Sequence, residues 1–184
     1  TNISIVEVTD ATNIPRLDYT DGGCPSLLLE PQSTNLIPYS EDFSNSAWTK
    51  ANATIASSSV VSPDGETDAY KIVESSGTSF HYIVDFLTLS GATTFSFFAK
   101  AGERSKVSAF LSQSGNNGGL FDLSAVTATA SGTGSTASIQ AVGNGWFRCV
   151  VSNDGSSALS TQIRIGVENG ALGSYLGDGT SGLY

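Results

Sequence analysis

Six side chains in this sequence have the types and the spacing that suit recognition of a sugar. They share the outward phase of alternating, strand-like runs, and they are Phe98, Lys100, Phe110, Arg148, Gln162 and Arg164. Proteins commonly bind a sugar by laying an aromatic ring against the apolar face of a pyranose, with planar amide or guanidinium donors around it. These residues would form such a carbohydrate-binding site if their strands are neighbours in one sheet. The alternative is that an arm of the chain or a partner subunit covers the two phenylalanines, because exposed aromatic pairs often mark interfaces.

Groups that could catalyse a reaction are few. His81 is the only histidine, and its sequence neighbours do not supply the nucleophile and orienting acid that a Ser-His-Asp triad needs. We therefore expect His81 to be a surface strand residue. Two carboxylates could hydrolyse a glycosidic bond if they lay roughly 5–10 Å apart in a cleft. The candidates are Asp42, Asp85, Asp122 and Glu168. In so acidic a chain we expect most carboxylates to be solvated, and we predict no enzymatic activity.

Metal binding has weak support in the sequence. Oxygen donors of the kind that Ca²⁺ prefers occur in candidate loops, at Glu41, Asp42, Asp64 and Asp178. They do not have the spacing of an EF-hand loop. We predict no metal site and no cofactor, and leave open a structural calcium ion.

The two cysteines, Cys24 and Cys149, are too few for a disulfide scaffold, and neither lies in a CxxC motif. Cys149 alternates in phase with Phe147 and Val151, which favours a buried free thiol. A Cys24–Cys149 disulfide is the alternative.

The element that must position these groups is the stretch Thr93–Gln113, which contains two runs with a period of two. Such alternation, rich in aromatic and β-branched residues, is typical of half-buried antiparallel strands. The residues expected on the core face are Phe95, Phe97, Ala99, Val107, Ala109 and Leu111. Gly102, Glu103 and Arg104 supply turn chemistry between the runs. The pattern predicts a central β-hairpin whose other face carries Phe98 and Phe110.

Other short runs predict further strands, with no helical periodicity over any long window. They include Ala69–Glu74, Ser79–Phe86, Trp146–Ser152 and Thr161–Val167, whereas Ala128–Ala137 is expected to be a long turn and Glu168–Gly182 a glycine-rich loop. Trp48 and Trp146 are expected in the core or at its rim. About ten short strands with turn-marked spacing indicate an all-β protein, an antiparallel β-sandwich. Among sandwiches we favour a jelly roll.

Composition limits the partners. The chain has 184 residues, 39% of them hydrophobic and only 14% charged, with a formal net charge of −9. Nucleic acids and anionic membranes are disfavoured, because both attract clustered Lys and Arg. No run of 18 apolar residues is present to span a bilayer. We predict an N-terminal arm or connector, residues 1–31, that packs on the main body or on a neighbouring chain, followed by a β-sandwich domain, residues 32–184.

Four phrases carry a resemblance to a known family. They are RLDYTDGGCPSLLLEPQSTNLIPYSEDFSNSAW (Arg16–Trp48), FSFFAKAGERS (Phe95–Ser105), FDLS (Phe121–Ser124) and VGNGWFRC (Val142–Cys149). Together they resemble a domain family of phage virion proteins and of some bacterial secreted proteins. That family is similar to carbohydrate-binding modules with a galactose-binding-like jelly roll. None of its binding residues has a motif that transfers to this chain.

The resemblance implies a non-catalytic module of a tail fibre, head fibre or related appendage on the virion surface. Its implied partners are glycans on the host surface or in the environment and other virion proteins, in a homo-oligomer such as a trimer. Two alternatives remain: a purely structural head-decoration or fibre-assembly domain, and an accessory module of a secreted polysaccharide-degrading enzyme. Family members continue after a GLY-type strand start into a further strand, whereas this chain stops at Leu183-Tyr184. We therefore expect it to be a segment of a longer protein.

Overall fold

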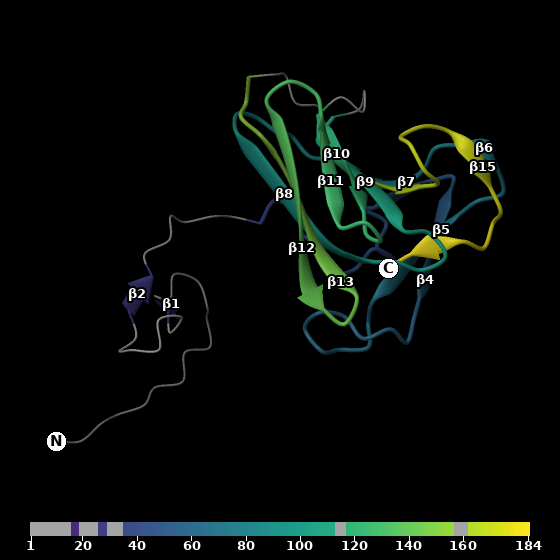
Figure 1. Ribbon diagram of the computed structural model, residues 1–184, viewed down its shortest axis with the longest axis horizontal. Helices are drawn as coiled ribbons and strands as arrows, with labels where there is room; N and C mark the ends of the chain where they lie inside the picture. The colour runs from purple at the N-terminus through teal and green to yellow at the C-terminus, as the bar shows by residue number, and fades with distance from the viewer. Residues whose placement is uncertain (1–15, 19–25, 29–34, 113–116, 157–161) are drawn as a thin grey trace. The chain divides into compact units, whose positions relative to one another are not determined.

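The chain forms two compact units, Thr1–Leu36 and Ile37–Tyr184. The computed structural model describes residues 16–18, 26–28, 35–112, 117–156 and 162–184, and these contain strands but no helix. Accordingly, no helix in the described residues could cross a membrane. In the first unit, β1 (Arg16–Asp18) pairs antiparallel with β2 (Ser26–Leu28) (Figure 1). Cys24 lies outside the described residues.

One layer of the second unit is a six-stranded antiparallel sheet. Its strands, in spatial order, are β11 (Thr127–Ser131), β10 (Gly118–Asp122), β9 (Lys106–Phe110), β14 (Ile163–Glu168), β7 (His81–Asp85) and β3 (Thr49–Ala51). The alternation in β14 buries Ile163, Ile165 and Val167, as the sequence predicts. Fully burying one such side chain contributes roughly 1.5–3 kcal/mol, so this face belongs to the core.

Two three-stranded sheets make up the other layer. One has the order β12 (Ser135–Gly143), β13 (Trp146–Asn153) and β8 (Thr93–Lys100), and the other has β16 (Gly182–Leu183), β5 (Tyr70–Glu74) and β4 (Ala53–Ser57). An isolated bridge between Ala101 and Leu183 joins β8 to β16. Next to it, Lys100 and Tyr184 exchange two backbone hydrogen bonds of 2.6 and 2.9 Å. A separate pair, β6 (Gly77–Ser79) and β15 (Tyr175–Gly177), lies apart from β12 and β13 (Figure 1).

The core lies between these sheets. Phe97 of β8 meets Phe121 of β10 edge-on, with ring centroids 5.8 Å apart. Trp48 and Trp146 are buried, as predicted, and each indole N–H donates to a backbone carbonyl: Trp48 to Tyr39 at 2.9 Å and Trp146 to Val61 at 2.8 Å. The described residues are thus all-β, in several antiparallel sheets, consistent with a β-sandwich.

The predicted central hairpin is wrong. β8 pairs with β13, and β9 pairs with β10 and β14, so the segment between β8 and β9 crosses from one layer to the other. Its turn is held by β16, because the Arg104 N–H donates to the Gly182 carbonyl at 3.0 Å. A Cβ at Gly102 would lie 2.6 Å from the Gly182 oxygen, so glycine is needed for this approach. Alternation predicts a strand and its faces, but it does not select the partner strand.

Three further expectations need correction. Residues 168–182 are not one glycine-rich loop, because Glu168 ends β14, β15 pairs with β6, and Gly182 begins β16. The segment 128–137 is not one long turn, because it contains most of β11 and the start of β12, joined by a short turn with Gly132 and Gly134 at positive φ. His81 is not a surface residue, because only 2% of it is exposed. It shares the inward phase of β7 with Ile83, which pairs with Ile165 of β14.

Candidate binding site

The six side chains proposed for sugar recognition divide between the two layers. Phe98 and Lys100 lie on β8 and Arg148 on β13, whereas Phe110 ends β9, Arg164 lies on β14 and Gln162 just precedes β14. Since β8 and β13 belong to a different sheet from β9 and β14, the six do not form one platform.

On the β8 sheet, three side chains form a row across neighbouring strands. Arg148 is the register partner of Phe98 on one side and of Gln140, on β12, on the other. Neighbouring strands lie about 4.8 Å apart, so the row spans about 10 Å. Phe98 is 48% exposed, and Arg148 and Gln140 are exposed as well. We call Phe98, Arg148 and Gln140 the Phe98 row.

The turn between β12 and β13 builds this row. Gly143, Asn144 and Gly145 all have positive φ, and a bulge lies between Ala141 and Gly143. This tight turn places Gln140 opposite Arg148. The sequence prediction omitted Gln140, although counting back from the turn could have identified it.

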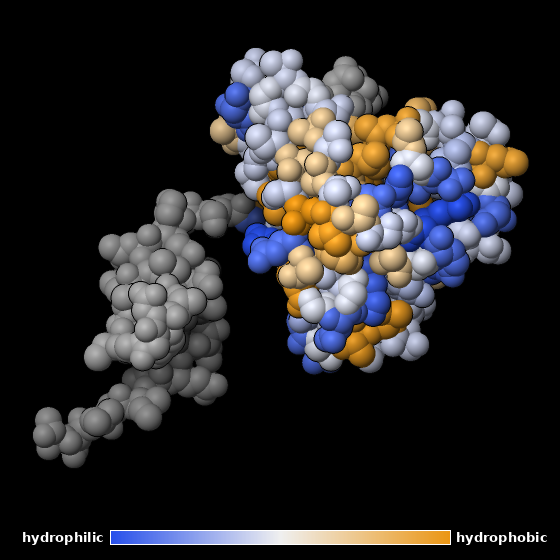
Figure 2. Space-filling model, in the orientation of Figure 1, coloured by the Kyte–Doolittle hydropathy of each residue, from blue (hydrophilic) through white to orange (hydrophobic). Residues whose placement is uncertain are grey.

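The surroundings of the row are open. Figure 2 shows apolar side chains gathered near the position that β12 has in Figure 1, with polar ones around them. A hollow of about 30 Å³ beside Phe98 is lined partly by Phe43, Tyr70 and Tyr184. It has room for about one water molecule. A sugar at the Phe98 row would therefore lie on the surface.

On the six-stranded sheet, Arg164 is held between two aromatic rings. Its guanidinium carbon lies 4.7 Å from the Phe110 centroid and 4.8 Å from that of Tyr82. Phe110 is only 2% exposed and Gln162 6%, so the expected exposed phenylalanine pair does not exist here. The Phe110 ring is occupied by a cation–π contact within the protein.

Glu168 lies two positions beyond Gly166 on the same face of β14 as Arg164. It is 5% exposed, and Ser108 Oγ donates to its Oε1 at 2.7 Å. The described residues contain only two buried side-chain atoms without a hydrogen bond, Glu168 Oε2 and Arg164 Nε. Burial raises the pKa of Glu168, opposed by the Ser108 hydrogen bond, the nearby Gly173 amide and the charges of Arg164 and His81. Burial also lowers the pKa of Arg164.

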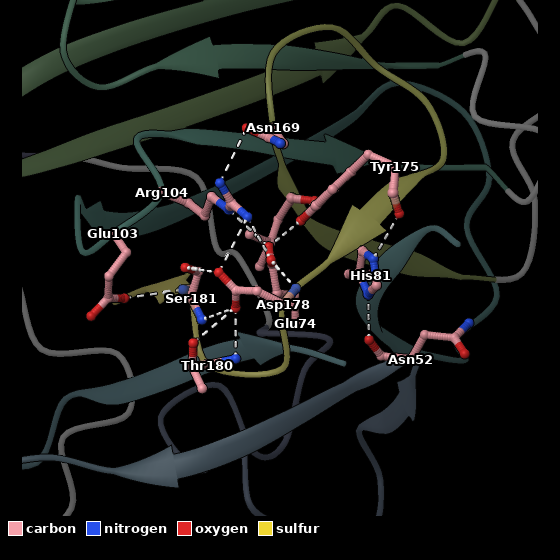
Figure 3. A network of polar contacts seen from close by, with 12 residues as sticks. Asn52, Glu74, His81, Glu103, Arg104, Asn169, Tyr175, Asp178, Thr180 and Ser181 are labelled. Carbon is pink, nitrogen blue, oxygen red and sulfur yellow. Dashed lines mark hydrogen bonds and ion pairs between the residues drawn. The ribbon is translucent and has the colours of Figure 1, made fainter. Parts of the chain in front are cut away.

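A second buried glutamate, Glu74 on β5, lies in a complete polar network (Figure 3). Arg104 donates to both of its oxygens, Nε to Oε2 at 2.9 Å and a terminal nitrogen to Oε1 at 2.6 Å. The Tyr175 hydroxyl donates to Oε2 at 2.6 Å and the Asp178 amide to Oε1 at 2.9 Å. Burial alone would raise the pKa of Glu74, but the hydrogen bonds from Arg104, Tyr175 and Asp178 outweigh it, so the pKa lies below its ordinary value.

His81 is fixed at the edge of this network. Its Nδ1 lies 2.6 Å from the Asn52 carbonyl oxygen and its Nε2 3.3 Å from that of Tyr175. Its ring packs on the Tyr175 ring with centroids 4.7 Å apart. Both nitrogens thus meet backbone carbonyls, which suits a role in anchoring β15.

The remaining loop carboxylates mostly order their own turns. Asp42 accepts hydrogen bonds from Ser44 and Tyr70, and Asp178 from Thr180 and Ser181. Among the described residues, no group of three or more His, Cys, Asp and Glu could hold a metal ion.

Three further carboxylates and the described cysteine complete the titratable groups proposed from the sequence. Asp64 accepts from the Ser62 hydroxyl and the Glu66 amide. Hydrogen bonds from Ser124 and the Ala125 amide lower the pKa of Asp122 to about 2, whereas burial raises that of Asp85. Cys149 is free and buried, as the sequence favoured, and burial raises the pKa of its thiol to about 12.

No protein-family model matches this chain, and a search of curated proteins finds no match to it.

Proposed function

We propose that this chain is a non-catalytic adhesion module of a phage surface appendage, which binds cell-surface or environmental glycans at the Phe98 row. The finer fold that goes with this proposal is a jelly roll of the galactose-binding-like type. The observation that carries the proposal is the alignment of an exposed aromatic ring, a guanidinium and an amide in one register row across three strands.

The row has the chemistry that a sugar requires. The Phe98 ring offers an apolar face to the C–H groups of a pyranose. Arg148 donates several N–H groups in a plane, and Gln140 both donates and accepts hydrogen bonds. Lys100 lies two residues from Phe98 on the same face of β8 and adds a cation at the margin of the row. A neutral or weakly acidic glycan chain fits this open surface.

Adhesion through an open surface depends on several copies acting together. A single row with one aromatic ring would bind weakly, and linked sites raise the overall avidity by roughly 10²–10⁴ without any new contact. The proposal therefore includes a homo-oligomer, for example a trimer, assembled with other virion proteins. The carboxylates of Asp42 and Asp122 already have structural partners, Ser44 and Tyr70 for Asp42 and Ser124, the Ala125 amide and Lys106 for Asp122, and the proposal gives them no catalytic role.

A purely structural assembly domain is the second candidate. It is favoured by exposed apolar side chains elsewhere, since Phe80, Phe86 and Leu176 are 48%, 60% and 70% exposed. A neighbouring subunit could cover such residues. Sedimentation tests this candidate: a stable oligomer that dissociates when Phe98 is replaced by Ala would place the Phe98 row at a subunit interface and contradict a free glycan site.

The direct test is a glycan array probed with the wild-type chain, Phe98→Ala, Arg148→Ala and the control Phe86→Ala. Phe86 is an even more exposed phenylalanine outside the row. We expect the first two variants to lose about tenfold or more in apparent affinity, since each removes roughly 1–3 kcal/mol of contact, and Phe86→Ala to bind as the wild type does. Equal loss in all three would indicate unspecific apolar adhesion, and unchanged binding by Phe98→Ala would overturn the proposed site.

A further inference from the structure

The two buried polar atoms that lack a partner in the described part of the chain lie on the same face of the same strand. They are Arg164 Nε, a donor, and Glu168 Oε2, an acceptor. Leaving such a group unsatisfied costs about 1–3 kcal/mol, and native proteins rarely tolerate it. One unsatisfied group is a donor and the other is an acceptor, and their residues lie two positions before and two positions after Gly166. This arrangement indicates a binding site rather than a packing defect.

The carboxylate of Glu168 is drawn toward Gly166. Ser108, the register partner of Gly166 on β9, donates to Glu168 Oε1 at 2.7 Å. A Cβ at Gly166 would lie 3.4 Å from Glu168 Oε1 and 2.7 Å from Ser108 Oγ. The carboxylate therefore lies close above Gly166. Glycine within a strand often marks a place where another group approaches the backbone closely.

The guanidinium of Arg164 approaches Gly166 from the opposite direction along β14. Tyr82 is the register partner of Gly166 on β7, and the Arg164 guanidinium carbon lies 4.8 Å from its ring centroid. The two charged groups thus converge near Gly166. No ion pair within the described part of the chain joins them.

A hydroxyl group matches this arrangement, because it can accept from an N–H and donate to a carboxylate at the same time. Two adjacent hydroxyls, as on a sugar or polyol, can serve both atoms with less distortion than one. An anionic ligand would satisfy Arg164 but would be repelled by Glu168 and by the net charge of −9. We infer that Arg164 and Glu168 form a second binding site, independent of the Phe98 row, which takes adjacent hydroxyl groups of a neutral sugar.

The test is amide NMR of the full chain, titrated separately with the methyl glycosides of glucose, galactose and mannose, and with glucuronate as a charged probe. We expect at least one neutral glycoside to shift the amides of Ser108 and of the β14 residues from Arg164 to Glu168, with weak, millimolar affinity of about −4 kcal/mol. Glucuronate should bind less well. Shifts at β14 with none at β8 would support this site even if the Phe98 row fails its own test.

The key variant is Glu168→Gln, which keeps the shape and an oxygen for Ser108 but replaces the unpaired acceptor by a donor. It should weaken binding of that glycoside by about tenfold or more. Glu41→Gln, at an exposed glutamate, is the matched control and should change nothing. Gly166→Ala, checked for folding by its amide spectrum, should also weaken binding, because the added methyl group would lie 2.7 Å from Ser108 Oγ and 3.4 Å from Glu168 Oε1 and so displace the carboxylate. The inference is overturned if no neutral glycoside shifts β14 amides at up to about 100 mM, if shifts occur only at β8 and β13, or if Glu168→Gln binds as the wild type does.

Discussion

Glu74 and Glu168 are both buried, with 1% and 5% of each residue exposed, yet their surroundings are opposite. Glu74 accepts four hydrogen bonds, two from Arg104 and one each from Tyr175 and the Asp178 amide. Glu168 accepts a side-chain hydrogen bond from Ser108 and has the Gly173 amide nearby, but its Oε2 has no hydrogen bond. Their pKa values move accordingly, down for Glu74 and up for Glu168.

The difference separates a structural carboxylate from one that is available to a ligand. Glu74 joins β5 to the β8–β9 connection through Arg104 and to β15 through Tyr175, so its negative charge stabilises the fold. Burial of the Glu168 carboxylate costs free energy that its hydrogen bonds offset only in part. A protein retains such a group where another molecule supplies the missing hydrogen-bond partner.

Replacing Arg104 by Met should have the largest effect on stability. It leaves Glu74 buried with its charge uncompensated, and breaking a buried ion pair in this way costs about 3–5 kcal/mol. Chemical denaturation measures the loss in free energy of unfolding. Arg148→Met, at an exposed arginine, should stay within about 0.5 kcal/mol of the wild type. Equal stabilities of the two variants would mean that the Glu74 network is not structural.

Replacing Tyr175 by Phe removes one hydrogen bond to Glu74 and leaves the ring in place against His81. The hydroxyl donates at 2.6 Å to a carboxylate, so we expect a loss of about 1.5–3 kcal/mol in the free energy of unfolding. Tyr39→Phe serves as the control, because the Tyr39 side chain is 45% exposed. A loss no larger than that of the control would show that Arg104 and the Asp178 amide suffice to satisfy Glu74.

Replacing Glu74 by Gln and replacing Glu168 by Gln should change the free energy of unfolding in opposite directions. The change at Glu168 should be the smallest of all. The lowered pKa of Glu74 gives stability that is present above the unfolded-state pKa and is lost as pH falls through the folded-state pKa. Glu74→Gln should therefore destabilise at about pH 7, and the deficit should shrink in acid.

The raised pKa of Glu168 means that its ionisation costs stability as pH rises through the folded-state value. Glu168→Gln should be neutral or stabilising by about 0–1 kcal/mol at about pH 7, with the difference vanishing below the unfolded-state pKa of about 4.3. Denaturation midpoints measured across pH give the stability change of both Gln variants. Destabilisation by Glu168→Gln at neutral pH would contradict the contrast between the two glutamates.

The sequence predicts where strands lie and which of their residues face the core, but it does not predict which strands pair. The alternation in Thr93–Gln113 and Thr161–Val167 predicts strands and inward faces that the structure confirms in β8, β9 and β14. The same alternation favoured a hairpin of β8 with β9, although the partners of β8 and β9 come from β13, β10 and β14. Those pairings depend on which apolar faces meet across the whole core, which is information that no local window contains.

The sequence predicts only part of the candidate binding site, for a related reason. Arg148 and Phe98 were assigned to the same outward phase, and the register makes them neighbours. Phe110 was expected to be exposed, because an alternating strand is assumed to have one solvated face, but both faces of β9 are buried. Glu74, Arg104 and Tyr175 meet only through the tertiary fold, since Glu74 and Tyr175 are 101 residues apart.

The most direct test of this contrast is a pH titration of the side-chain carboxyl carbons of Glu74 and Glu168 by ¹³C NMR, assigned with the two Gln variants. We predict that Glu74 titrates below the ordinary glutamate value of about 4.3 and Glu168 above it. A neutral glycoside that binds at β14 should move the Glu168 titration and leave that of Glu74 unchanged. Titration of both carboxyls on the same side of the ordinary value would contradict the division between a structural and a ligand-accepting carboxylate.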